Sequence, residues 1–251
     1  MFKVFQPRYT IWPSLMFDAL RFSDLHYSYP SQNGVEALSG ITFSVEQGEK
    51  IALLGLNGAG KTTLLLQTNG LLMPTSGEVE VDGVVVSKKS LSEVRRKVGL
   101  VFQNSDDQLF SPTVSEDVAF GPQMMRLPAQ EIECRVSEAL ESVSASHLIN
   151  RQISSLSGGE RRMIAIATVL SMSPTLLVFD EPTSYLDLKA TNKLIKQLQR
   201  LPQAMLIATH NLELALEICD RAILLDKGRL IYDGPTSCGV DRLRLLADDL
   251  C

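Results

Sequence analysis

The sequence predicts an α/β fold with a mostly parallel core sheet, an antiparallel β-subdomain near the N-terminus and an inserted helical subdomain. Short apolar runs typical of buried strands alternate with segments whose apolar residues recur at helical spacing. The segment 77–83 alternates acidic and apolar residues between two glycines, which indicates part of an antiparallel strand pair. From about 106 to 170 the pattern is mostly helical, so a helical subdomain is expected to interrupt the strands.

Each expected buried strand is a short apolar run between turn residues. We expect strands over 20–29, 41–45, 51–54, 98–102, 176–179, 205–208 and 222–225. Helices are expected over 62–69, 128–143, 158–170, 188–201 and 211–219. The last of these opens with Asn211, whose short polar side chain suits a helix N-cap.

The length and composition fit one large domain, because the chain has 251 residues of which 45% are hydrophobic. We expect this principal domain over 20–236, a flexible extension over 1–19 and a short tail over 237–251. No run of about 18 or more apolar residues occurs, so the sequence predicts no membrane-spanning helix.

The net charge and the spacing of the cysteines indicate which classes of partner and which redox compartment to expect. The net charge is −5 and there is no dense block of Lys or Arg, which argues against nucleic acid as a partner. The cysteines lack C-x-x-C spacing, as is typical of reduced thiols rather than of disulfides or a zinc site. They are Cys134, Cys219, Cys238 and Cys251.

Residues 55–62 read Gly-Leu-Asn-Gly-Ala-Gly-Lys-Thr and match the G-x-x-x-x-G-K-[ST] phosphate loop, after an apolar strand and before a helix. The glycines allow backbone N–H groups to form an anion-binding nest, and the helix start adds its positive dipole end. Lys61 would bind the β- and γ-phosphates, and Thr62 would offer a hydroxyl to Mg²⁺. The alternative is a glycine-rich turn without function. The expected nucleotide-binding residues are Gly55, Leu56, Asn57, Gly58, Ala59, Gly60, Lys61, Thr62 and Thr63.

Two carboxylates follow the apolar strand over 176–179. Asp180, at the strand end, would reach Mg²⁺, usually through a water molecule. Glu181 faces another direction and suits a base that accepts a proton from the attacking water. The alternative is an ordinary acidic pair at a strand end.

Two further strands end in polar side chains. His210 closes an apolar strand and would donate a hydrogen bond to the γ-phosphate, unless it is an ordinary surface histidine. Gln103 follows the strand over 98–102, where a neutral amide would touch Mg²⁺ and the water without adding charge.

A second anion site is expected at the start of the helix over 158–170. The preceding residues are Leu156, Ser157, Gly158, Gly159 and Glu160. Ser157 suits an N-cap, and the glycines leave the first N–H groups of the helix accessible. This site suggests that one chain offers it to the nucleotide of another; the alternative is a simple capped helix.

Taken together, these segments resemble the ABC-type ATPase family over roughly 20–236. The matching motifs are Walker A at 55–62, the signature at 156–160, the Walker B end at 180–183 and the D-loop at 184–187. Glu160 stands where the signature usually has Gln, and Tyr185 is bulkier than the usual D-loop residue. Gln103 matches the Q-loop and His210 the switch histidine.

The resemblance implies a P-loop NTPase fold and hydrolysis of ATP with Mg²⁺. It implies catalytic roles for Glu181, His210 and Gln103, and a metal site at Thr62, Gln103 and Asp180. Tyr29 lies where the family places the aromatic residue that stacks on adenine. The resemblance also implies a dimer, as homodimer or heterodimer, in which the signature and Asp187 face the ATP of the second ATPase subunit.

A narrower resemblance links the stretch 98–110 to energy-coupling-factor importers, whose members often have Pro where this chain has Ser105. The stretch 209–213 is similar to the same group. This resemblance implies a peripheral position on the cytoplasmic face of the cell membrane, with an integral membrane subunit docking near residues 103–110. Cobalt or nickel is the expected cargo; the alternatives are biotin or another vitamin, or a soluble ABC ATPase unrelated to transport.

Overall fold

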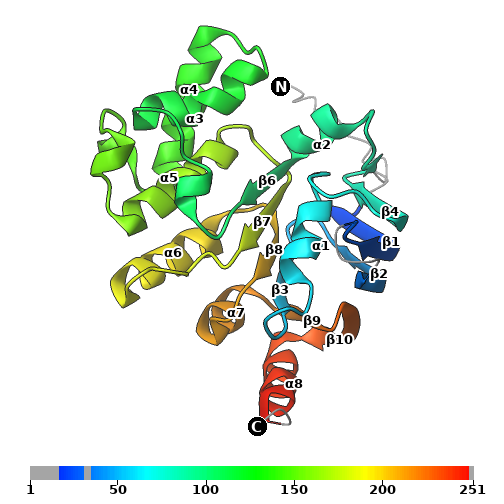
Figure 1. Cartoon of the computed structure of the whole chain (residues 1–251). Helices are drawn as coiled ribbons and strands as arrows, with labels where there is room; N and C mark the ends of the chain where they lie inside the picture. The colour runs from blue at the N-terminus through cyan, green and yellow to red at the C-terminus, as the bar shows by residue number, and fades with distance from the viewer. Residues whose placement is uncertain (1–16, 31–34, 249–251) are drawn as a thin grey trace, which may run out of the picture.

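The computed structural model describes residues 17–30 and 35–248, which form two sheets and their covering helices (Figure 1). The six-stranded sheet has the order β10-β9-β3-β8-β7-β6 and is parallel except for β10, so the expected mostly parallel core sheet is confirmed. Its strands are β3 (Lys50–Leu54), β6 (Val98–Val101), β7 (Leu176–Asp180), β8 (Ala204–Ala208), β9 (Arg221–Asp226) and β10 (Arg229–Pro235).

The second sheet is antiparallel, as expected for the N-terminal part, and has the order β2-β1-β4-β5. Its strands are β1 (Leu20–Ser28), β2 (Glu36–Val45), β4 (Ser76–Val81) and β5 (Val84–Val85). β2 begins before the expected residue 41, because it already pairs with β1 at Glu36. Gly40, with φ +63°, allows the strand to continue through an irregular stretch of the pairing.

Helices cover both faces of the parallel sheet. They are α1 (Lys61–Gln67), α2 (Leu91–Lys97), α3 (Val114–Met124), α4 (Ala129–Ser142), α5 (Gly158–Leu170), α6 (Leu188–Arg200), α7 (Leu212–Ile218) and α8 (Thr236–Asp248). Short 3-10 turns are η1 (Ser105–Asp107), η2 (Ser146–Leu148) and η3 (Ile153–Ser155). Figure 1 shows α3, α4 and α5 gathered on one side of the sheet, away from the antiparallel strands, in agreement with the expected helical subdomain.

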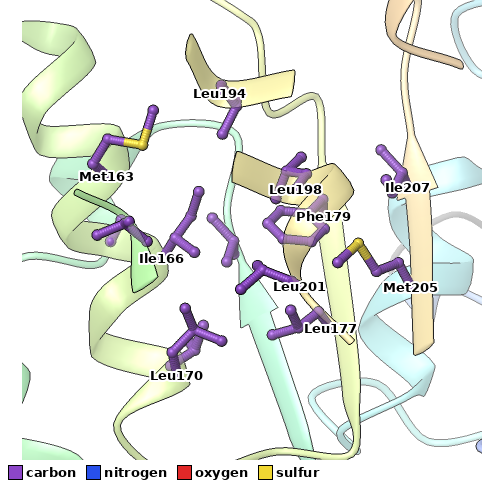
Figure 2. Packing of buried hydrophobic residues seen from close by; sticks show 14 of the residues in the cluster. Met163, Ile166, Leu170, Leu177, Phe179, Leu194, Leu198, Leu201, Met205 and Ile207 are labelled. Atoms are coloured by element: carbon purple, nitrogen blue, oxygen red, sulfur yellow. The ribbon is translucent and has the colours of Figure 1, made fainter. Parts of the chain in front are cut away.

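The core has two layers because successive residues of a strand face opposite sides of the sheet. Leu177 and Phe179 of β7 belong to the layer beneath the helical subdomain, whereas Leu176 and Val178 belong to the layer shared with α1 and the antiparallel sheet. Figure 2 shows the first layer from close by, with α5 packed by a helical stripe of apolar side chains against β7 and α6.

The C-terminal segment is more structured than the expected short tail. Residues 236–248 form α8, which packs on β9 and β10 and buries Val240 and Leu243. Gly239 permits this approach, since a Cβ there would lie 2.9 Å from the Cβ of Ala222. Residues 1–16 of the expected flexible extension over 1–19 lie outside the described residues. Of its last three residues, Ala19 is fully buried. In the described part of the chain, no helix combines the length and apolar character that crossing a membrane requires.

Candidate functional site

A cavity of about 640 Å³ opens where the carboxyl ends of β3, β6, β7 and β8 meet. Parallel strands end at the same edge of a sheet, so segments far apart in sequence come together there. The cavity is lined by Tyr29, Val35, Glu36, Ala37, Asn57, Gly58, Ala59, Gly60, Lys61, Thr62, Thr63, Gln103, Asp180, Glu181, Ser184, His210, Lys227 and Gly228. Most of the predicted nucleotide-binding and catalytic residues are among them.

The phosphate loop takes a shape that only glycine allows at its two ends. Gly55 has φ +152°, and a Cβ there would lie 2.6 Å from the carbonyl oxygen of Leu225. Gly60 has φ +102°, and a Cβ there would lie 3.0 Å from the carbonyl oxygen of Ala37. Gly55 and Leu56 do not line the cavity themselves; their carbonyl groups hold the lysine of the loop.

The Lys61 ammonium lies at the floor of the cavity, with its side chain almost completely buried. Nζ donates hydrogen bonds to the carbonyl oxygens of Gly55 at 2.7 Å and Leu56 at 3.2 Å. Burial lowers the pKa of Lys61, and the charges of Glu181 and Asp180 oppose this shift. The two carbonyl groups therefore hold a cationic side chain at the phosphate loop, where a phosphate group would need a positive charge.

Thr62 and Asp180 lie together, as the metal prediction requires. Thr62 Oγ1 donates a hydrogen bond of 2.8 Å to Asp180 Oδ2, although the two residues are 118 positions apart. Burial raises the pKa of Asp180, and the Thr62 hydrogen bond and the Lys61 charge oppose this rise. Together with Gln103 on the same cavity wall, these groups offer the oxygen ligands that Mg²⁺ prefers.

Within residues 17–30 and 35–248 there is no cluster of three or more His, Cys, Asp or Glu side chains able to hold a metal by themselves. A hydroxyl, one carboxylate and an amide still fit Mg²⁺, because this ion usually completes its shell with water and substrate phosphates. The donor set is therefore suited to a nucleotide-bound magnesium ion rather than to a permanently bound metal.

Glu181 is held with one oxygen free. Its Oε2 accepts a hydrogen bond of 3.1 Å from the backbone N–H of His210. Its Oε1 is buried without a hydrogen-bond partner in the described structure, although His210 Nε2 lies 3.3 Å away. Burial raises the pKa of Glu181, and the His210 N–H group opposes this rise. This arrangement leaves Oε1 buried beside the His210 ring without a hydrogen bond in the described structure.

The backbone at Glu181 is left-handed, with φ +47°. This conformation costs a non-glycine residue roughly 1–2 kcal/mol. The hydrogen bond from Glu181 N–H to the carbonyl oxygen of Ala208 fixes it there at 2.9 Å.

Tyr29 lines the cavity, and its hydroxyl lies 2.9 Å from Thr63 Oγ1. Its ring packs edge-on against Tyr27, with centroids 4.9 Å apart. The cavity is also lined by residues that were not predicted from the sequence, namely Val35, Glu36, Ala37, Lys227 and Gly228, and by Ser184 of the expected D-loop. A signal for one of them was the Lys-Gly pair at 227–228, since Gly228 has φ +76° and lies against the Ala37 backbone.

The predicted signature lies apart from this cavity in its own chain. Ser157 caps α5 and Glu160 completes the capping box: Ser157 N–H donates to Glu160 Oε2 at 2.8 Å, and Glu160 N–H donates to Ser157 Oγ at 3.3 Å. Ser157, Gly159, Glu160 and Asp187 line a separate cavity of about 310 Å³. Gly158 lines another cavity beside Gln103, and Leu156 is buried.

The comparisons with known proteins agree with this geometry. A family model described as ABC transporter matches residues 38–184, which is more than half of the chain. A putative ABC transporter ATP-binding protein of Geobacter sulfurreducens is 52% identical, over 85% of this chain and 85% of the relative. The energy-coupling factor transporter ATP-binding protein EcfA of Methanothermobacter thermautotrophicus is 48% identical, over 86% of this chain and 70% of the relative.

Solved structures give the same result. CbiO1 of Clostridium perfringens, part of the ABC transporter complex cbiONQ, has a TM-score of 0.81 and 36% identity, covering 93% of this chain and 95% of that one. A dimeric ATP-binding cassette in a post-hydrolysis state bound to ADP and Pi has a TM-score of 0.76 and 26% identity, covering 86% and 98%. The sequence matches, the shared fold and the phosphate-loop cavity agree: the chain belongs to the ABC transporter family and is an ATPase of that family.

Proposed function

We propose that this chain is the ATP-hydrolysing subunit of an energy-coupling-factor importer that carries cobalt or nickel ions. The observation that carries the proposal is an exposed apolar groove beside the 103–110 segment, on a chain similar to EcfA and CbiO1. ATP is hydrolysed in the nucleotide cavity, and the membrane subunit binds in the groove.

For hydrolysis, each residue of the cavity has a proposed role. Lys61 and the loop N–H groups bind the phosphates, and Glu181 Oε1 takes the proton of the attacking water. His210 and Gln103 orient the γ-phosphate and that water. When bound, Mg²⁺ would neutralise charge on the β- and γ-phosphate oxygens, with Thr62, Gln103 and Asp180 holding it.

A second ATPase subunit is needed because the signature does not face the nucleotide cavity of its own chain. Ser157, Gly159 and Asp187 share a different cavity, lined by the first residues of α5 and α6 and by residues of the 145–148 segment. Two copies, or this chain and a related ATPase, would each close the other's nucleotide site. The dimeric cassette bound to ADP and Pi supports this arrangement.

The groove has a volume of about 700 Å³ and is largely apolar. Its side chains include Phe110, which is 66% exposed, Phe120 and Met124. The two phenylalanine rings stand edge to face with centroids 4.7 Å apart. Exposed aromatic and methionine side chains clustered in a groove are typical of a protein-docking site, since methionine adapts to varied partner surfaces.

The charges around the groove indicate which polar and charged side chains the docked segment carries. Asp117 is buried at its floor; one carboxylate oxygen accepts a hydrogen bond of 3.2 Å from Ser111 N–H, and the other has no partner in the described structure. One wall is basic, formed by Lys88, Lys89, Arg95 and Arg96. We therefore propose an amphipathic helix from the membrane subunit, with a donor side chain for Asp117 and acidic residues toward the basic wall.

The docking proposal is tested by co-purification of the tagged chain from detergent-solubilised membranes of cells that express the complete transporter. Phe110→Asp should abolish recovery of the integral membrane subunit while ATPase activity of the isolated chain stays normal. Leu245→Asp is the matched control, because Leu245 is 65% exposed on α8, away from the groove. Recovery of the membrane subunit by the Phe110 variant contradicts docking in this groove.

The cargo is tested by uptake of radioactive cobalt, nickel and biotin in cells whose copy of the chain carries Glu181→Gln. Uptake of cobalt or nickel should fall to background while biotin uptake is unchanged. Loss of biotin uptake with normal metal uptake would assign the vitamin role instead. Normal uptake of all three would favour an ATPase that serves another process.

A further inference from the structure

Arg162, on the second turn of α5, is buried and has an unusual set of partners. The residue is 2% exposed. Its Nη1 donates a hydrogen bond of 2.6 Å to the carbonyl oxygen of Phe102, and its Nη2 donates to the carbonyl oxygen of Gln103. Both acceptors lie at the point where the chain leaves β6 for the nucleotide cavity.

The guanidinium is buried without a countercharge. Among residues 17–30 and 35–248, no ion pair involves Arg162, and its Nε has no hydrogen-bond partner. Burial lowers the pKa of Arg162, with no neighbouring acid to oppose the shift. A buried charge without an ionic partner is costly, and an apolar side chain would pack α5 at lower cost. The residue is therefore not explained by stability alone.

The helix that carries Arg162 is firmly anchored. The next residue, Met163, points with Ile166 and Leu170 into the core against β7, as Figure 2 shows. A side chain on such a helix has little freedom to follow a moving loop. The two carbonyl groups are thus tied to a fixed point.

Gln103 is the acceptor that matters for the proposed function, because this residue lines the nucleotide cavity. Neighbouring contacts also join this segment to α5: Arg161 pairs with Asp106 at 2.9 Å, and Gln108 donates to the carbonyl oxygen of Ala165 at 2.6 Å. Those contacts reach later positions of the segment. Arg162 is the α5 side chain that holds the backbone of Gln103 itself.

We propose that Arg162 is a positioning residue for ATP hydrolysis, which acts by fixing the Gln103 backbone so that the Gln103 amide faces the phosphate site. The inference rests on the proposed role of Gln103. Positioning affects the chemical step more than nucleotide binding, since Lys61 and the loop N–H groups supply the binding.

The test is a double-mutant cycle on the purified full-length chain, with variants Arg162→Met, Gln103→Ala and the combination. Arg162→Met should lower kcat about tenfold or more, as expected when a catalytic group is misplaced by a fraction of an ångström, with KM for ATP changed by less than about twofold. The double variant should be no slower than Gln103→Ala alone. Arg162→Lys, which keeps a donor, should recover part of kcat.

Arg135→Met is the matched control, because Arg135 lies on α4 in an ion pair with Glu131 and far from the loop in the fold. If Arg162→Met does not fold, the same cycle with Arg162→Lys and Arg162→Gln decides the question. Independent losses in the double variant, or a normal kcat for every Arg162 variant, overturn the inference while the proposed function stands. A normal kcat for Gln103→Ala overturns both the inference and the proposed role of Gln103. A lower melting temperature with unchanged kcat per folded molecule would reveal a purely structural residue.

Discussion

Glu181→Gln is the most informative single change, because it removes one proton acceptor and alters little else. The glutamine side chain has the same size, and its oxygen can still accept the hydrogen bond from His210 N–H that now reaches Glu181 Oε2 at 3.1 Å. The other position, Oε1, loses its ability to take a proton. Nucleotide contacts through the phosphate loop stay intact.

The expected loss follows from the role of a general base, which contributes about 10²- to 10⁴-fold to a rate. At 1.36 kcal/mol per factor of ten, this is about 3 to 5 kcal/mol of transition-state stabilisation. Affinity for ATP should change by less than about threefold, since binding depends on other groups. The melting temperature should stay equal or rise, because burial raises the pKa of Glu181 and so disfavours its charged form in the folded state.

The pH dependence provides a second signature. A base acts only when deprotonated, so kcat falls as the pH drops through its pKa. Burial raises the pKa of Glu181, so the acid limb of the native profile should lie above the ordinary glutamate range. The Glu181→Gln profile should lack this limb.

The assay is phosphate release at saturating ATP from about pH 5 to about pH 9, with nucleotide affinity measured separately by equilibrium binding. Glu213→Gln, an exposed change on α7 outside the cavity, is the matched control. A Glu181→Gln rate within about threefold of the native one, or the same acid limb, would refute the assignment of the base.

Three other changes test the remaining parts of the argument. Lys61→Ala should weaken ATP binding by at least about tenfold in equilibrium titrations, because it removes a charge-assisted contact to phosphate; undiminished affinity contradicts its role. Mixing Ser157→Ala chains with Lys61→Ala chains should leave at most one working site per pair, so activity equal to that of the native pair would exclude shared sites. Phe179→Ala should lower the free energy of unfolding by about 3–5 kcal/mol in urea, since its ring is fully buried in the core layer of Figure 2. A loss below about 1 kcal/mol would contradict this prediction, because it would mean that the core closes around the space left by the ring.

The parallel strands could be predicted because each is buried on both faces and therefore reads as a continuous apolar run. β10 and α8 were not predicted. β10 is an antiparallel edge strand whose residues alternate between exposed and partly covered, so it lacks such a run. Burial of α8 depends on the contact of Gly239 with Ala222, which no local pattern reveals.

The same distinction holds for the site. Lys61, Asp180 and Glu181 could be predicted to share one cavity, because each lies at or shortly after the carboxyl end of an apolar strand. Glu36 and Ala37 were missed because β2 reaches the cavity through tertiary packing against the phosphate loop. The Arg162 contact was missed for a related reason, since an arginine on a helix is expected to face solvent unless the structure shows otherwise.

The segment 102–110 connects the nucleotide cavity to the groove proposed for docking. At its start Gln103 lines the nucleotide cavity, and at its end Phe110 lines the groove. Between them, Asp106 and Gln108 bind α5, whose first residues carry the signature. A docked helix that displaces Phe110 therefore acts on a segment already joined to both ATP-binding elements. We propose that this connection is the physical route by which hydrolysis in the nucleotide cavity alters the groove.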